Sequence, residues 1–271
     1  MKPHDAHAAS KTPDVTHVGI SDLLSAGRIF YSDNFVTLYH GDAVTILANS
    51  PKKIVDGVVT SPPYNTLEAQ IKNNRNTAAA HHSNKWVKKQ NACYADAMDE
   101  VSYQHFVSYV VALCLARSKG LVWVNHKIRF RDGKGLHPLS FLPFPLWSEV
   151  IWNRGGTMAI KPRRFLPTHE GFWGFGRPHW WDESLAKNMS VWNIGQEYSE
   201  DHPCPFPEIL VKRLIAASVP PDGIVLDPFA GSGTVLRAAK DLGRKSIGIE
   251  LNEAYCELIA KRCEQEVLDL K

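Results

Sequence analysis

The sequence predicts an α/β fold with a mostly parallel sheet and helices on both faces. The clearest indication is the segment 223–250, where a short apolar strand, a glycine turn, a helix and a second strand follow one another. Apolar strand-like segments at 35–39 and 121–124 each adjoin a segment with helical spacing of apolar residues. Strands that alternate with helices in this way are typical of a parallel sheet covered by helices.

The predicted elements account for most of the chain. Helical spacing of apolar residues favours helices, and short apolar or alternating segments between turn residues favour strands. In chain order the pattern predicts a helix within 16–30, a strand at 35–39, a helix from 43 to 47, a strand at 55–60, a helix at 100–116, strands at 121–124, 147–152 and 170–175, a helix after 207, a strand at 223–226, a helix from 235 to 242, a strand at 245–250 and a helix at 252–268. The strands at 147–152 and 170–175 are expected to pair antiparallel at a sheet edge. The segments 126–147 and 178–201 are predicted to be irregular.

The glycine turn points to a nucleoside ligand. Asp227 ends one strand, and Glu250, 23 positions later, ends the next. In nucleotide-binding α/β units an acid about 20 residues after the glycine turn binds the ribose hydroxyls. The dinucleotide pattern would need a third glycine where Leu236 stands, and no lysine follows the turn to grip a phosphate. A ligand with a ribose and no pyrophosphate, such as S-adenosylmethionine, therefore fits better than NAD.

A second motif follows the strand predicted at 55–60. Ser61, Pro62, Pro63 and Tyr64 come directly after it. Two prolines cannot continue a buried strand, and they stiffen the turn so that the neighbouring carbonyl groups and side chains are held in place. A bare Pro-Pro pair is more often an ordinary turn. The complete motif at a strand end, in a chain that also has the glycine turn, favours a reactive site.

The charge of the chain is uneven although its net value is only +3. Basic clusters lie in three segments predicted to be loops, within 68–90, 127–134 and 154–164. One such cluster is usually a solvated face, but three of them indicate a polyanionic partner. Trp86 lies among lysines, where it could either stack on a base or pack its own loop. The candidate contacts are Lys85, Trp86, Lys88, Lys89, Arg129, Arg131, Arg154, Lys161, Arg163 and Arg164.

Other features limit the class of protein. The five cysteines have no C-x-x-C spacing and the histidines form no convincing metal pair, so we expect no metal site. We find no apolar stretch of about 18 residues and no signal-peptide pattern. These features predict a reduced, cytoplasmic protein. We expect a flexible tail at 1–16 and a single domain at 17–271.

The two motifs together resemble those of the DNA amino-methyltransferases. The cofactor motif of that family is similar to the string from Asp227 to Thr234 (Asp-Pro-Phe-Ala-Gly-Ser-Gly-Thr), and its catalytic motif to Ser61–Tyr64. The catalytic motif comes first, as in the β class. The resemblance implies a circularly permuted Rossmann-like fold with a mostly parallel seven-stranded sheet and an antiparallel edge hairpin. It also implies S-adenosylmethionine as cofactor, double-stranded DNA as partner, and a prokaryotic or phage origin.

The resemblance assigns roles to individual residues. Glu250 would bind the ribose hydroxyls, Asp42 would lie near the adenine, and residues around Pro207 would close over the methionine end. The residues implied to bind the cofactor are Asp42, Pro203, Phe206, Pro207, Asp227, Pro228, Phe229, Gly231, Gly233, Thr234 and Glu250. Those implied to hold the target amine are Ser61, Pro62, Pro63 and Tyr64. No separate recognition domain is evident, so DNA recognition is expected at 66–98, 126–145, 154–166 and 177–201.

The implied reaction is transfer of a methyl group to the exocyclic amine of a flipped base. Ser61 stands where other members have Asp, which favours cytosine N4, with adenine N6 as the alternative. An RNA or protein methyltransferase, a non-catalytic DNA-binding subunit and a nicotinamide oxidoreductase are less favoured interpretations. A homodimer and a cognate restriction endonuclease acting on the same site are further expectations.

Overall fold

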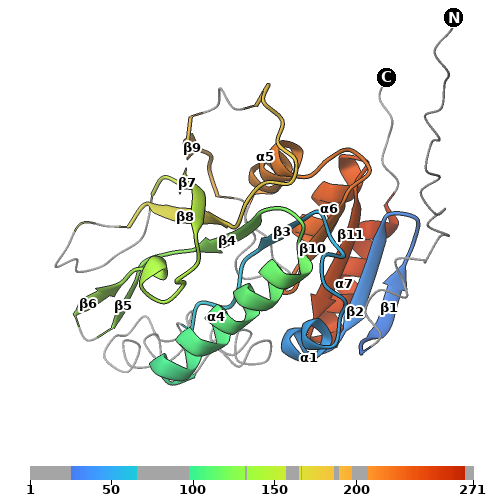
Figure 1. The fold of residues 1–271 in the computed structure, drawn as a ribbon, viewed down its shortest axis with the longest axis horizontal. Helices are drawn as coiled ribbons and strands as arrows, with labels where there is room; N and C mark the ends of the chain where they lie inside the picture. The colour runs from blue at the N-terminus through green and yellow to red at the C-terminus, as the bar shows by residue number, and fades with distance from the viewer. Residues whose placement is uncertain are drawn as a thin grey trace, which may run out of the picture.

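A computed structural model describes residues 26–65, 98–131, 133–156, 165, 167–185, 189–196 and 207–265. In this part of the chain a nine-stranded sheet has the order β1-β2-β11-β10-β3-β4-β8-β7-β9 (Figure 1). Its strands are β1 (Arg28–Ser32), β2 (Val36–His40), β3 (Gly57–Thr60), β4 (Val122–His126), β7 (Leu146–Asn153), β8 (His169–Phe175), β9 (Val191–Asn193), β10 (Ile224–Asp227) and β11 (Lys245–Glu250). The helices are α1 (Ala43–Ala48), α4 (Glu100–Arg117), α5 (Glu208–Ser218), α6 (Thr234–Asp241) and α7 (Glu253–Glu264).

The central part of the sheet is parallel. Strands β2, β11, β10, β3 and β4 run in one direction, and β8 and β7 follow as an antiparallel hairpin. This arrangement confirms the predicted α/β class and the pairing of 147–152 with 170–175. The sheet has two strands more than expected, because β1 pairs with β2 at one edge and β9 pairs with β7 at the other.

Three local predictions were wrong. Residues 28–30 belong to β1 rather than to a helix, because they pair antiparallel with β2. The segment predicted to be irregular at 126–147 contains a small hairpin of β5 (Arg129–Arg131) and β6 (Lys134–Leu136) and a short 3-10 helix, η2 (Pro138–Ser140). The segment 178–201 contains β9. Strands of three residues are too short to show an apolar alternation, so the sequence pattern does not reveal them.

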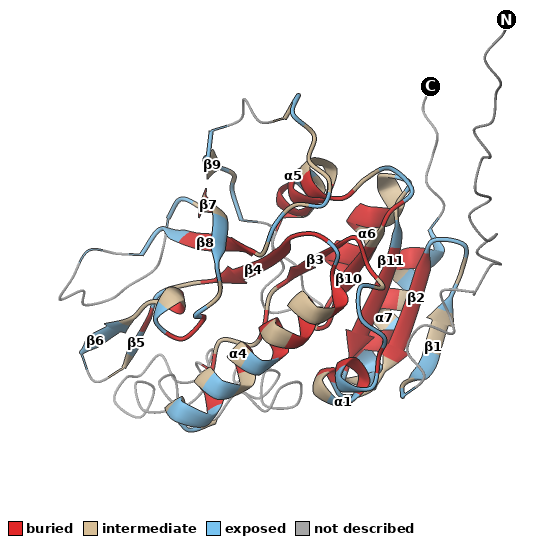
Figure 2. Cartoon of the chain, viewed as in Figure 1, coloured by how far each residue is buried: buried red, intermediate tan, exposed pale blue. Residues whose placement is uncertain are grey.

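Helices cover both faces of the sheet, as predicted. One core cluster contains buried residues of α1 and α4, and the other contains buried residues of α5, α6 and α7. Successive residues of one strand enter opposite clusters, as Val58 and Val59 of β3 do. Figure 2 shows the central strands buried and α4 buried along its inner side. Burial of both faces explains why these strands are continuous apolar runs rather than alternating ones.

The topology places both sequence motifs at the carboxyl ends of the parallel strands. Strands β2, β11, β10, β3 and β4 run in the same direction, so their carboxyl ends lie together along one side of the sheet, called the carboxyl edge. The helix that follows β10, α6, packs on one face of the sheet, and the helix that follows the neighbouring strand β3, α4, packs on the other. In open α/β sheets ligands bind outside the carboxyl ends of the strands at such a switch point. Among the helices described, none is long and apolar enough to cross a membrane.

Candidate active site

The glycine turn follows β10 and is held by the side chain of Glu250. Gly231 and Gly233 have φ values of 54° and 78°, in the left-handed region that favours glycine. Glu250 Oε2 accepts a hydrogen bond from the Gly231 N–H at 2.8 Å, and Oε1 accepts one from the Asn252 N–H at 2.9 Å. The acid predicted to bind the ribose thus also fixes the backbone of the turn. A carboxylate has about four lone-pair sites, so it can still accept from a ligand hydroxyl.

Asp227 is a second buried carboxyl at the same edge. Its Oδ1 accepts hydrogen bonds from Thr60 Oγ1 at 2.7 Å and from the Phe229 N–H at 3.1 Å. Burial raises the pKa of Asp227 to about 7, and the nearby charge of Glu250 acts in the same direction. Burial also raises the pKa of Glu250. Within the described ranges neither carboxylate has a Lys or Arg ion-pair partner.

The two buried carboxyls define the chemistry of a suitable ligand. They repel a phosphate, and they attract a ligand that brings hydroxyl donors and a positive charge. S-adenosylmethionine has both, in its ribose and in its sulfonium and amino groups. The residues at this edge therefore fit the cofactor that the sequence predicts.

The remaining cofactor candidates lie around this edge, where they are described. Asp42 follows β2 and caps α1, because its Oδ1 accepts from the N–H and the hydroxyl of Thr45 at 2.8 and 2.7 Å. Pro228 and Phe229 belong to the turn, and the Phe229 ring packs edge-on against Phe106 of α4 at 6.0 Å. Thr234 begins α6, and Pro207 is the N-cap of α5. Pro203 and Phe206 lie outside the described residues.

The Ser-Pro-Pro-Tyr motif lies beside the glycine turn, because β3 and β10 are parallel neighbours. Ser61 Oγ is 3.2 Å from the Tyr64 hydroxyl and 3.3 Å from Asn125 Oδ1. The Tyr64 hydroxyl donates toward Asn125 Oδ1 and lies 3.2 Å from Glu170 Oε2. Side chains from the ends of β4 and β8 thus surround the predicted catalytic motif.

The aromatic ring of Tyr64 lies beside a second ring and a cation. Its centroid is 5.0 Å from the His126 ring, and the Lys127 ammonium lies 4.7 Å from it. A tyrosine at a strand end beside a cation offers a stacking surface for a nucleic-acid base. The role of Tyr64 toward the target base stays a prediction.

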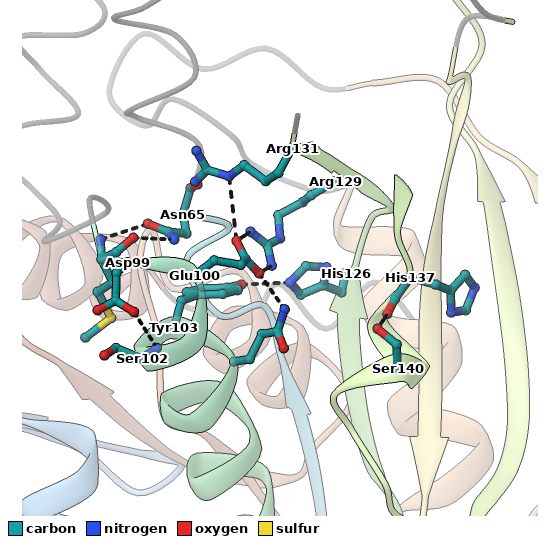
Figure 3. A network of polar contacts seen from close by, with 12 residues as sticks. Asn65, Asp99, Glu100, Ser102, Tyr103, His126, Arg129, Arg131, His137 and Ser140 are labelled. Atoms are coloured by element: carbon teal, nitrogen blue, oxygen red, sulfur yellow. Dashed lines mark hydrogen bonds and ion pairs between the residues drawn. The ribbon is translucent and has the colours of Figure 1, made fainter. Parts of the chain in front are cut away.

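The predicted DNA contacts that are described have partners inside the protein. Arg129 is buried, and its guanidinium donates to both oxygens of Glu100 at 2.8 and 2.7 Å (Figure 3). Burial alone would raise the pKa of Glu100, but the hydrogen bonds from Arg129 and Gln104 and the charges of Arg129 and Arg131 together outweigh it, and the pKa is lowered. Arg131 donates to the Asn65 carbonyl, and Arg154 pairs with Glu170 at 3.3 Å. The DNA contacts of all three arginines stay predictions.

The other predicted DNA contacts lie outside the described residues: Lys85, Trp86, Lys88, Lys89, Lys161, Arg163 and Arg164.

A cavity of about 390 Å³ opens beside the Ser-Pro-Pro-Tyr motif. Its walls combine cationic and apolar groups, a composition that suits a base attached to a phosphate backbone. The lining residues are Asn65, Lys127, Ile128, Arg129, Phe130, Arg131, Arg154, Phe165, Pro167 and His169.

Four residues of this site are missing from the sequence prediction: Tyr103, Asn125, His126 and Glu170. Asn125 and His126 end β4, and Glu170 is the second residue of β8, which pairs antiparallel with β4. None of the four belongs to a sequence motif. For the three strand residues the one available signal was a polar residue near the end of a buried strand, which becomes informative only when the strand order is known.

The fold and the site point to a class of protein. A glycine turn with two buried carboxyls, next to a rigid Pro-Pro motif at the carboxyl ends of neighbouring strands, fits a nucleoside cofactor beside a second ligand. Residues 55–262 match the N6/N4 methyltransferase family model described as DNA methylase. The chain therefore belongs to this family, and it is a β-class DNA amino-methyltransferase that uses S-adenosylmethionine.

Curated relatives and solved structures agree with this assignment. The chain is 28% identical to the Type II methyltransferase M.ScaI of Streptomyces caespitosus, over 93% of this chain and 89% of that protein. It is 26% identical to M.XycI of Xanthomonas campestris pv. cyanopsidis, over 84% and 87%.

The fold is similar to that of the PvuII DNA methyltransferase (cytosine-N4-specific). The TM-score is 0.68 at 18% identity, with 89% of this chain and 90% of that chain covered. A DNA modification methylase of Thermus thermophilus, in complex with S-adenosyl-L-methionine, gives a TM-score of 0.58 at 24% identity, over 86% and 96%. Both likenesses concern the fold.

Proposed function

We propose that the chain methylates the N4 amine of cytosine in double-stranded DNA and that Ser61–Tyr64 is the catalytic motif. The observation that carries the proposal is the position of Ser61, a neutral side chain at the end of β3, beside the glycine turn. Its hydroxyl belongs to a cluster with the Tyr64 hydroxyl and Asn125. The name of the PvuII enzyme specifies cytosine N4 and so supports the same base.

The residues of the motif can activate the target amine, which is a poor nucleophile. S-adenosylmethionine supplies a methyl group that its sulfonium already activates, whereas the lone pair of an exocyclic amine is drawn into the base. Ser61 Oγ and the Pro62 carbonyl can accept the two N–H bonds of that amine. These contacts favour a pyramidal nitrogen whose lone pair is free for attack. Preorganised acceptors of this kind are a major source of rate enhancement.

The target base must leave the duplex to reach this site. In the proposed pose Tyr64 stacks on the base, and Asn125 and Glu170 hold the Tyr64 hydroxyl. The adjoining cavity takes the neighbouring strand, with Lys127 and Arg154 facing its phosphates. No covalent intermediate is needed. The described cysteines, Cys114, Cys256 and Cys263, are buried, and burial raises the pKa of each thiol.

We extend the proposal to the cofactor contacts that the family resemblance implies. Glu250 binds the ribose hydroxyls, Asp42 lies near the adenine, and Asp227 with the turn from Pro228 to Thr234 faces the methionine and ribose side. Pro203, Phe206 and Pro207 close over the methionine end. Recognition of the DNA sequence is assigned to segments 66–98, 126–145, 154–166 and 177–201 of a single domain, 17–271, that follows a flexible tail at 1–16.

Three broader proposals accompany this function: a homodimer, a cognate restriction endonuclease and a cytoplasmic location. The names of M.ScaI and M.XycI, both Type II methyltransferases, support the endonuclease. Light scattering on the purified protein tests the dimer. Protection of host DNA against nucleases after expression of the chain tests the shared site.

The base assignment is tested on the product. DNA methylated with labelled cofactor is digested to nucleosides, which are separated and identified by mass spectrometry. We expect label in N4-methylcytosine. Label in N6-methyladenine would overturn the base and leave the reaction type standing, because Ser61 can accept from either amine. Label on cytosine C5 would overturn the mechanism, because that reaction needs a cysteine nucleophile.

A further inference from the structure

The catalytic motif is tied to helix α4 through one buried tyrosine. The Tyr103 hydroxyl donates to the Pro63 carbonyl at 2.8 Å and lies 2.8 Å from His126 Nε2. Tyr103 is 1% exposed and His126 is 0% exposed, so water does not compete for these contacts. Pro63 is the third residue of the motif, so this hydrogen bond acts on the backbone that carries Ser61 and Tyr64.

The tyrosine is itself held rigidly. The Arg129 guanidinium lies 4.2 Å from the centre of its ring, and Arg129 is fixed by Glu100 of the same helix (Figure 3). Phe141 packs edge-on against the ring at 6.2 Å. The oxygen of the Tyr103 hydroxyl is therefore held between the Pro63 carbonyl and His126 Nε2, and only its hydrogen is free to turn.

The Tyr103 hydroxyl has a second possible acceptor, His126 Nε2, besides the Pro63 carbonyl. Burial lowers the pKa of His126 to about 3, so its ring is neutral and carries one N–H. His126 Nδ1 lies 2.8 Å from the Lys127 carbonyl, which can only accept. With that N–H in use, Nε2 becomes an acceptor and competes with the Pro63 carbonyl for the single hydroxyl hydrogen of Tyr103. The Tyr103 hydroxyl can thus turn from the Pro63 carbonyl to His126 Nε2 without losing a hydrogen bond.

We propose that Tyr103 is a positioning residue for methyl transfer, which sets the Ser61–Tyr64 motif through the Pro63 carbonyl, with His126 as its alternative partner. This inference rests on the proposed catalytic role of that motif. Among the described residues Tyr103 is the donor to this carbonyl, so removal of its hydroxyl takes away the hydrogen bond that holds the backbone in the middle of the motif. Misplacement of a reacting group by about 1 Å can cost roughly a hundred-fold in rate.

The test is Tyr103→Phe, which keeps the ring and its packing and removes only the hydroxyl. We expect kcat to fall about ten-fold or more, while KM for DNA and the Kd for S-adenosylmethionine change less than about three-fold. Tyr109→Phe, on an exposed position of the same helix, is the matched control and should keep wild-type kinetics. Tm and cofactor titration report whether each variant is folded.

The outcomes separate the two proposals. An unchanged kcat, a loss of activity in proportion to unfolded protein, or a chain that fails to fold would each overturn the positioning role. Tyr64→Ala is measured beside it. If Tyr64→Ala abolishes transfer and Tyr103→Phe does not, only the inference about Tyr103 fails. If both leave kcat intact, the assignment of the catalytic motif itself is wrong.

Discussion

The cofactor side and the target side of the site are built in different ways. On the cofactor side, β10, the glycine turn and β11 are close in sequence, and Glu250 accepts hydrogen bonds from the backbone N–H of Gly231 in the turn and of Asn252 just after β11. On the target side, the segment of Ser61 and Tyr64 meets Asn125 of β4 and Glu170 of β8 through side chains. The first half is fixed by local backbone geometry and the second by tertiary packing, so mutations in the two halves should have separable effects.

The largest separation is expected for Tyr64→Ala. Loss of the ring removes the surface proposed to stack on the base, so transfer should fall at least about a hundred-fold. Cofactor affinity should stay within a few-fold, because β10 and β11 are untouched. Single-turnover assays and calorimetric titration measure the two quantities. Tyr64→Phe serves as the control: it keeps the ring, loses the bonds to Asn125 and Glu170, and should retain much more activity than Tyr64→Ala. A parallel loss of cofactor binding in Tyr64→Ala would mean that Tyr64 serves the cofactor and not the target base.

The reverse pattern is expected for Glu250→Ala. This change removes the bonds to Gly231 and Asn252 and the proposed contact to the ribose. A hydrogen bond to a charged group is worth about 1.5–3 kcal/mol, so the cofactor Kd should rise about ten-fold or more. Glu253→Ala, an exposed glutamate at the start of α7, is the matched control. An unchanged titration for Glu250→Ala rules out the ribose role.

A smaller and salt-dependent effect is expected from the predicted DNA-binding loop. Reversal of Arg163 and Arg164 to Glu should weaken DNA binding and flatten its salt dependence, because each phosphate contact contributes about −0.9 to the log–log slope. The same reversal at Arg28, at the opposite edge of the sheet in β1, is the control. Fluorescence anisotropy at several salt concentrations gives the slope. If slope and affinity match the wild type, the loop is a solvated face.

The same difference explains how much could be predicted from the sequence. The order of strand, turn, helix and strand around Gly231 was predictable because the residues that form it are neighbours in the chain. The partners of Tyr64 were not, because Asn125 and Glu170 become neighbours only when β8 pairs antiparallel with β4. Arg129 shows a further limit. Its basic segment predicts a DNA contact, which stays a prediction, but a charge count carries no information about its burial or its ion pair with Glu100 of α4.

The smallest predicted effect concerns pH and Asp227. Its pKa in the folded protein is raised from 3.8 to about 7 by burial, so the stability linked to this group is fully present below about pH 4 and is lost as pH rises through about 7. The ionised carboxylate attracts the positively charged cofactor, so affinity should change in the opposite sense and increase by roughly five-fold between about pH 6 and pH 8.

Asp227→Asn keeps an acceptor for Thr60 and removes the titration, so both pH dependences should flatten. Denaturation and cofactor titration over this pH range measure them. Glu250→Gln is the comparison, because it changes the neighbouring carboxyl and should weaken binding while the dependence due to Asp227 remains. If the wild-type affinity is flat between these pH values, Asp227 is already ionised or does not face the positive charge, and the cofactor side must then rely on Glu250 and the turn alone.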